Sequence, residues 1–196
     1  MNRRSSGSLS LFSIISFVAH RAYYTRRFPP AEGETIDRLE WTPLTVLAAL
    51  LSLLALLSTM AYVISPFLVS WGSAGLPYWL RWLGVAPSVV GFILLEWSHR
   101  ALGRNWSDQP RITRAQQLVQ NGPYKWIRHP IYAGFLLILG STLLISSNWL
   151  AGGAWISSVA LDGAVRMRYK EQAMLQRFGA EYQEYKRRTG AILPRF

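Results

Sequence analysis

Residues 42–66 read TPLTVLAALLSLLALLSTMAYVISP and contain no Asp, Glu, Lys or Arg. A helix needs about 20 consecutive, mainly apolar residues to cross the hydrocarbon core of a bilayer, and this run is longer. Apart from the terminal prolines, little more than Thr and Ser interrupts its Leu, Ala and Val residues. Within a bilayer every backbone amide must find a partner inside its own segment or in a closed barrel. The run therefore predicts a transmembrane α-helix.

Two further apolar runs flank this one. Residues 79–97 form a second candidate span, and residues 10–22 form a shorter one. The basic pair before the short run also fits a cleaved signal peptide, but no clear small-x-small cleavage site follows it and Arg21 lies within it. We therefore favour an anchoring helix at residues 10–22.

A fourth apolar stretch runs from residue 131 to residue 165. It contains Ser146-Ser147-Asn148-Trp149, a sequence typical of a turn. The turn predicts two short helices, at residues 131–146 and 149–165, each near the lower length limit for a crossing. The predicted fold class is therefore all-α: one polytopic transmembrane domain, residues 1–196, with about five spans and a C-terminal helix in the cytosol.

The distribution of basic residues orients this arrangement. Residues 21–41, 98–130 and 166–196 contain 4, 6 and 8 of the 21 Lys and Arg residues. Loops rich in Lys and Arg remain in the cytosol, so these three segments and the C-terminus are predicted to be cytosolic. The same asymmetry accounts for the net charge of +11. Because the basic residues flank apolar runs instead of forming one hydrophilic face, no nucleic-acid partner is predicted.

Composition also excludes several kinds of site. The chain has no cysteine, which rules out a disulfide, a thiol nucleophile and a thiolate metal site. Its three histidines, at 20, 99 and 129, follow no familiar metal-ligand spacing, so no metal site is predicted.

Two polar segments differ from ordinary connections. Residues 98–130 are long for a loop, and aromatic and aliphatic residues are interleaved with their charges, which favours a functional loop. In residues 163–188 apolar residues recur every three or four positions, which predicts an amphipathic helix running out of the last span. Gly179 is the weak point of that helix. Such a helix could also lie on anionic lipid headgroups.

Three motifs in these segments resemble one family. LVQNGPYKWIRHPIYAG at residues 118–134 resembles the core motif of the isoprenylcysteine carboxyl methyltransferase and phospholipid methyltransferase families. FGAEYQEYKRRTGAILP at residues 178–194 resembles their closing stretch, and LGRNWS at residues 102–107 the segment before the core motif. The resemblance covers about residues 96–196, the expected catalytic region, and leaves residues 1–95 as N-terminal transmembrane helices.

The resemblance implies a cofactor, a substrate and site residues. The family transfers a methyl group from S-adenosylmethionine to the carboxylate of a lipidated cysteine or to a lipid amine. Arg166 is the implied substrate-binding and catalytic arginine. The family's usual acidic pair falls on Lys170 and Glu171, so its cofactor and catalytic role is assigned to Glu171. The other implied cofactor contacts are Gln109, Gln116, Gln117, Leu118, Val119, Tyr124, His129, Pro130, Ile131 and Tyr132.

This chemistry suits the residues. A carboxylate is already an anion at neutral pH, so the protein must mainly position the two reactants, an effect worth up to about 10 kcal/mol. A sulfonium can rest on aromatic faces such as those of Tyr124, Trp126 and Tyr132. Arg166 can hold a carboxylate in a bidentate fork. A charged cofactor would enter from the cytosol and a lipophilic acceptor sideways from the surrounding membrane lipids.

Simpler interpretations of the same residues stay open. Arg166 follows Asp162 by one helical turn, so the two could simply form an ion pair. His129 could only start a helix whose first turn holds Pro130. Structural roles are predicted for the packing pair Tyr182 and Tyr185 and for the ion pair of Glu96 with Arg100.

Three other functions compete with a carboxyl methyltransferase. The first is N-methylation of a phospholipid amine. The second is an NADPH-dependent reductase, because membrane sterol reductases resemble this family in their C-terminal region. The third is a scaffold without catalysis, which the basic side chain of Lys170 keeps open.

Overall fold

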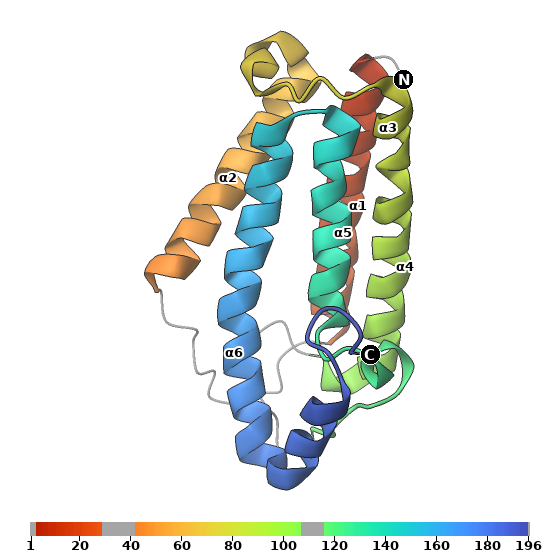
Figure 1. The fold of residues 1–196 in the computed structure, drawn as a ribbon, viewed down its shortest axis with the longest axis vertical. Coiled ribbons are helices and arrows are strands. Elements are labelled where there is room, and N and C mark those ends of the chain that lie inside the picture. The colour runs from red at the N-terminus through yellow and green to blue at the C-terminus, as the bar shows by residue number, and fades with distance from the viewer. Residues whose placement is uncertain (1–2, 29–41, 107–115, 196) are drawn as a thin grey trace.

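The computed structural model describes residues 3–28, 42–106 and 116–195, and its regular structure there is helical, which confirms the predicted all-α class. The helices form one elongated bundle with the chain termini toward opposite ends (Figure 1). The elements are α1 (Arg3–Arg27), α2 (Pro43–Ile64), η1 (Pro66–Gly72), α3 (Tyr78–Leu83), α4 (Val85–Leu102), η2 (Gly103–Asn105), η3 (Gly122–Lys125), α5 (Pro130–Ser146) and α6 (Trp149–Arg188).

Local sequence sets several helix ends. The Thr42 side chain accepts a hydrogen bond from the backbone N–H of Thr45 at 3.2 Å and caps α2. The left-handed Ser147 (φ 53°) ends α5. The next residue, Asn148, accepts from the Ala151 N–H at 3.0 Å and caps α6. The predicted turn at residues 146–149 is therefore confirmed.

The structure corrects the bounds of two predicted helices. Residues 79–97 are not one helix, because the helix is interrupted at Gly84, between α3 and α4. A Cβ on Gly84 would lie 2.8 Å from Leu144, so only glycine allows this close packing on α5. Helix α1 extends beyond residues 10–22 at both ends. Hydropathy detects the apolar part of a helix, whereas the polar turns at its ends carry no such signal.

The last span and the amphipathic helix are one element. Helix α6 runs without a break from the end of the bundle that holds the 146–149 turn to a kink at Gly179, where φ is 49° and ψ is −119°. This backbone conformation favours glycine. The predicted continuation of the span into an amphipathic helix is confirmed, and Gly179 turns the last residues of α6 back toward the bundle (Figure 1).

Two helical segments of the described chain are long and apolar enough to cross a membrane: α2, and residues 78–105, which include α3 and α4. Helix α5 is apolar but shorter. Helix α2 leaves a continuous apolar surface uncovered along its length; its large exposed side chains are Leu44, Val46, Leu47, Leu50, Leu53, Leu54, Leu56, Leu57 and Ile64. This surface suits contact with lipid.

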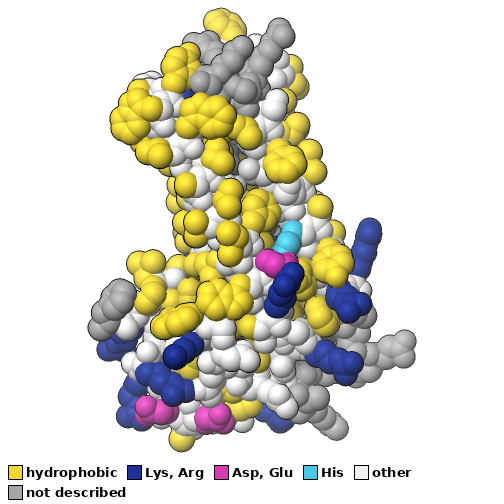
Figure 2. All heavy atoms as spheres, turned by 90° about the vertical axis from the view of Figure 1, so that its right-hand side faces the viewer, with side chains coloured by type: hydrophobic (Ala, Val, Ile, Leu, Met, Phe, Trp, Pro, Cys, Tyr) yellow, Lys and Arg dark blue, Asp and Glu magenta, His cyan; other side chains and the backbone are white. Residues whose placement is uncertain are grey.

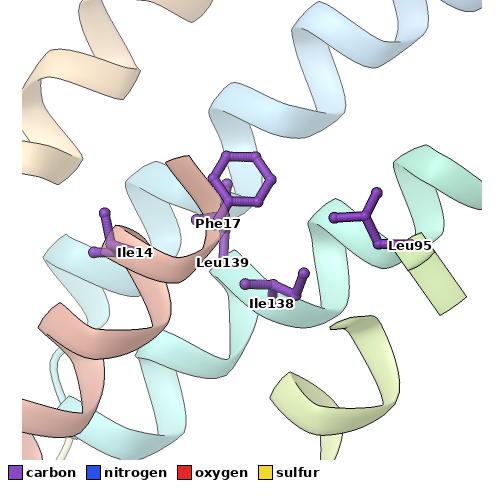
Figure 3. Close-up of a cluster of buried hydrophobic side chains, with 5 residues drawn as sticks. All are labelled: Ile14, Phe17, Leu95, Ile138 and Leu139. Carbon is purple, nitrogen blue, oxygen red and sulfur yellow. The ribbon is translucent and has the colours of Figure 1, made fainter. Parts of the chain in front are cut away.

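The interior combines an apolar cluster with small polar contacts. The cluster joins three helices, with Ile14 and Phe17 from α1, Leu95 from α4, and Ile138 and Leu139 from α5 (Figure 3). Hydrogen bonds between small side chains, the Ser13–Ser88 pair at 3.3 Å and the Ser52–Ser158 pair, link neighbouring helices. Such contacts are common where helices pack in membranes, since burial of apolar surface drives little association there.

The tightest helix contact is at Gly152, where α6 approaches α5. A Cβ at this position would lie 2.3 Å from the Leu143 Cα, whereas a Cβ on the adjacent Gly153 would meet nothing within 4 Å. We expect Gly152→Ala to destabilise the protein by roughly 1–3 kcal/mol, because the two backbones must separate. Thermal unfolding in detergent would measure this, with Gly153→Ala as the matched control. Equal melting temperatures for the two variants would show that this contact does not determine stability.

Candidate active site

The C-terminal tail docks on the segment that precedes α5. The Gly190 N–H donates to the Trp126 carbonyl at 3.1 Å, and the Arg128 N–H donates to the Gly190 carbonyl at 2.9 Å. The His129 N–H donates to the Ala191 carbonyl at 2.9 Å. The kink at Gly179 makes this return possible. The core motif and the closing stretch therefore lie side by side, although about 60 residues separate them in sequence.

Glu171 of α6 joins these parts. Its carboxylate accepts hydrogen bonds from Arg128 Nε at 3.0 Å, from His129 Nε2 at 3.2 Å and from Lys186 Nζ at 2.6 Å. The side chains of Arg128 and His129 are 9% and 8% exposed, so the carboxylate faces two nearly buried partners. One acid thus connects α6, the start of α5 and the residues after the kink.

Burial and hydrogen bonding fix the charges in this network. The hydrogen bond from His129 holds the pKa of the Glu171 carboxyl well below its usual range; burial opposes the shift, and Lys186 and Arg128 support it. Burial lowers the pKa of His129, although its bond to Glu171 acts in the opposite direction. At neutral pH Glu171 is therefore an anion, and a neutral His129 donates through Nε2–H.

Arg128 also closes the C-terminal end of α6. Its Nη1 donates to the Lys186 carbonyl at 3.1 Å and to the Thr189 carbonyl. The last carbonyls of a helix have no partner within it, and a guanidinium both satisfies them and opposes the helix dipole. Arg128 therefore holds the closing stretch in place through charge and hydrogen bonds together.

A cavity lies beside this network, between α1, α4, α5, α6 and the segment before α5. Most residues expected to contact the cofactor line it. They are Gln116, Gln117, Leu118, Val119, Tyr124, His129, Ile131 and Tyr132. The structure therefore gathers the core motif around one space, with the first turn of α5 as one wall.

Three expected residues do not line the cavity, and a fourth is not described. Pro130 is buried as the first residue of α5 and does not line the cavity, while His129 precedes it at the helix start. Glu171 holds its three basic partners and is not among the lining residues. Trp126 does not line the cavity either; its ring packs against Trp97 at a centroid distance of 5.9 Å. Gln109 lies outside the described residues.

Arg166 lies at the cavity and also forms the ion pair with Asp162 that its sequence allowed. It lines the cavity, and its Nε donates to the Asp162 carboxylate at 2.8 Å one helical turn earlier. Asp162 lines the cavity too, and the side chains of Arg166 and Asp162 are 24% and 36% exposed. The ion pair is therefore part of the wall, and it fixes the direction of the guanidinium there.

Lys170 lines the cavity one turn after Arg166, at the position where the resembled family has an acid. Other lining residues could not be foreseen. Helix α1 contributes His20 and Arg21 to the opposite wall, and α4 contributes His99. No motif marked these residues, because only the packing of α1 beside α4 and α5 brings them to the site.

The remaining structural pairs are as predicted. Arg100 Nε donates to Glu96 at 2.6 Å. Tyr182 and Tyr185 are each 3% exposed and pack at a ring-centroid distance of 5.9 Å. The Tyr185 hydroxyl donates to the Tyr124 carbonyl at 2.8 Å and braces the core motif. Both tyrosines also line the cavity.

Sequence comparison finds similarity to one family. The model of the isoprenylcysteine carboxyl methyltransferase (ICMT) family matches residues 82–176. Protein-S-isoprenylcysteine O-methyltransferase A of Arabidopsis thaliana is 28% identical over 189 residues, which cover 95% of this chain and 92% of that protein. Form B of the same plant is 30% identical over 119 residues, 60% of each chain. The chain thus spans about three fifths of the length of several relatives that it matches.

Comparison with solved structures gives the same fold. The structure of a eukaryotic intramembrane Ras methyltransferase, ICMT, matches with a TM-score of 0.59 at 20% sequence identity. The match covers 95% of this chain and 67% of that one. The helical arrangement described above, including the N-terminal helices that the family model leaves out, is therefore similar to that of a membrane enzyme.

Proposed function

We propose that the chain is a member of the isoprenylcysteine carboxyl methyltransferase family, to which it is similar, and that it is an S-adenosylmethionine-dependent methyltransferase of the membrane. Its proposed acceptor is lipophilic, with the α-carboxylate of a prenylated cysteine as the reacting group. One observation carries the proposal: the core motif and the Arg166 turn of α6 line the same cavity.

The lining residues fit the proposed cofactor. S-adenosylmethionine supplies an electrophilic methyl group on a sulfonium. Tyr124 and Tyr132 offer aromatic faces on which such a cation can rest. Gln116 and Gln117 offer amide donors and acceptors for the polar parts of a nucleoside. In this proposal Glu171 supports the cofactor wall indirectly, through its bonds to Arg128 and His129.

The charges of the cavity favour a carboxylate acceptor over an amine. Arg166 and Lys170 both line the α6 wall, where they would attract an anion and repel an ammonium group. A carboxylate also reacts without losing a proton, whereas a lipid ammonium must lose one first. We therefore assign Arg166 to hold the acceptor carboxylate, and phospholipid N-methylation is the weaker alternative.

We propose that the bundle crosses the membrane about five times, with the cavity and the C-terminus in the cytosol. Of the 21 Lys and Arg residues, 18 lie in the three segments expected there. On the face shown in Figure 2, Lys and Arg side chains gather in the lower half, which holds the C-terminal part of α6, while the upper half is mainly apolar. The cavity then opens at the rim of the bilayer, within reach of a water-soluble cofactor and a lipophilic acceptor.

Ligand binding tests the function directly. Protein purified in detergent should bind S-adenosylhomocysteine with micromolar affinity and should not bind NADPH, as measured by calorimetry. Incubation with methyl-labelled S-adenosylmethionine and a prenylcysteine should then give a base-labile methyl ester. Binding of NADPH alone would indicate a reductase, and binding of neither ligand a scaffold; either result would overturn the proposal.

A further inference from the structure

A wall of histidine and aromatic rings closes the cavity on the side of α1 and α4, and the proposed roles do not use it. His20 of α1 and His99 of α4 both line the cavity, with ring centroids 5.1 Å apart. The rings of Tyr24 and Trp106 lie 4.1 Å and 5.4 Å from that of His99. This wall lies opposite the basic side chains of α6.

Hydrogen bonds fix the proton on each neutral imidazole. His99 Nδ1 lies 2.8 Å from the Leu95 carbonyl, which can only accept, so Nδ1 carries the hydrogen. His20 Nε2 lies 3.0 Å from the Glu96 carboxylate, so in His20 the hydrogen is on Nε2. The second nitrogen of the His99 ring, Nε2, is then an acceptor with a lone pair.

Neither His99 Nε2 nor His20 Nδ1 has a hydrogen-bond partner among the residues that the structure describes. His20 Nδ1 is enclosed and unpaired. His99 is only 3% exposed, but its Nε2 is not fully enclosed. The ring of His99 borders the cavity. Buried polar atoms in folded proteins almost always have a partner, and exceptions often indicate a functional site. A molecule in the cavity would supply the missing donor to His99 Nε2, whereas the enclosed Nδ1 of His20 is out of its reach.

The surroundings specify the kind of donor. The lone pair on His99 Nε2 can accept an N–H bond, and Arg21 lines the cavity beside His20. The nearby face of Trp106, which also lines the cavity, suits a positively charged nitrogen. The basic groups of the opposite wall suit a carboxylate. The cavity therefore offers an acceptor for a nitrogen at His99 and basic groups for a carboxylate on α6, which are the two parts of an amino-acid-like group.

We propose that His99, with His20 beside it, forms a subsite that accepts hydrogen bonds from an N–H group adjacent to a carboxylate. The inference rests on the proposed function, which offers two sources of this chemistry. One is the α-ammonium group of S-adenosylmethionine. The other is the amide N–H beside the reacting carboxylate of a prenylcysteine. His99 is then a specificity-determining residue, because it recognises this nitrogen and takes no part in breaking or forming a bond.

Two variants of His99 test the subsite. His99→Phe keeps a ring but removes the acceptor, and His99→Gln restores an acceptor through its amide oxygen. If the cofactor is the source of the N–H group, His99→Phe should lower the affinity for S-adenosylhomocysteine about tenfold, as measured by calorimetry. This is the effect expected for the loss of one hydrogen bond to a charged group. Affinity for 5′-methylthioadenosine, which lacks the amino-acid part, should not change. His99→Gln should recover most of the loss.

If the acceptor is the source, cofactor affinities stay unchanged. The KM for N-acetyl-S-prenylcysteine should then rise about tenfold, while the KM for an S-prenyl-3-mercaptopropionate, which lacks the amide, stays constant. The subsite is refuted if His99→Phe changes neither the two cofactor-analogue affinities nor the two substrate KM values. It is also refuted if the variant weakens both analogues, or both substrates, equally, because that result would indicate altered packing. Should His99→Phe fail to fold, His99→Met removes the acceptor in its place.

The two proposals fail separately. If the wild-type protein methylates no prenylcysteine, the proposed acceptor is wrong, but the comparison of S-adenosylhomocysteine with 5′-methylthioadenosine still tests His99. If the wild-type protein is active and the His99 variants show neither selective loss, the subsite is wrong and the proposed function stands.

Discussion

Replacement of Arg166 by alanine should abolish measurable methyl transfer and leave cofactor affinity within a few-fold of the wild-type value. In the proposed site the guanidinium holds the acceptor carboxylate through two charge-assisted hydrogen bonds. Their loss is worth about 3 kcal/mol, or roughly a hundredfold or more in kcat/KM. Arg166 lies on α6, whereas the expected cofactor residues lie mainly on the core motif across the cavity. Calorimetry with S-adenosylhomocysteine and a methyl-ester assay would measure the two quantities.

Two further variants separate substrate binding from the ion pair with Asp162. If Arg166 only forms an ion pair with Asp162, then Asp162→Asn should be as damaging as Arg166→Ala, because each variant removes one charge of that pair. If Arg166 holds the substrate, Asp162→Asn should retain most of the activity, since the guanidinium remains. Arg166→Lys should recover little, because an ammonium cannot form the planar fork. Full activity of Arg166→Ala would exclude its substrate role.

The helices were largely predictable because each is written in a contiguous stretch of sequence. The apolar run of α2 and the turn at residues 146–149 required no knowledge of tertiary contacts. The break at Gly84 was not predictable, because it depends on how closely α3 and α5 pack. The ends of α1 were missed for a different reason, since its terminal turns are polar.

The candidate site divides in the same way. The segment from Gln116 to Tyr132 carried a motif, and the structure places most of it around one cavity. The His20 and His99 wall carried no motif, since its parts lie 79 residues apart in sequence and meet only through helix packing. Glu171 was singled out for a cofactor role, which stays a prediction; its partners became visible only because the Gly179 kink brings Lys186 back toward the earlier turns of α6.

Replacement of Glu171 by glutamine should destabilise the protein by about 3–5 kcal/mol, because it leaves nearly buried Arg128 without a counter-charge. Lys186 loses its acceptor too, so the closing stretch should detach and become sensitive to protease. Thermal unfolding and limited proteolysis without ligand would measure both effects. The matched control is Glu184→Gln, whose partner Arg187 is 75% exposed. That surface pair should be worth no more than about 1 kcal/mol.

The same variant distinguishes a supporting role of Glu171 from a direct cofactor contact. A direct contact alone predicts that Glu171→Gln melts like the wild type without ligand and loses only the stabilisation that S-adenosylhomocysteine provides. If Glu171 instead holds the Arg128–His129 segment in place, the ligand-free variant is already less stable than the wild type. Its cofactor affinity then falls because that segment is no longer held. Since Glu171 bonds to that segment and does not line the cavity, we expect the second result. Unchanged melting of the ligand-free variant would contradict it.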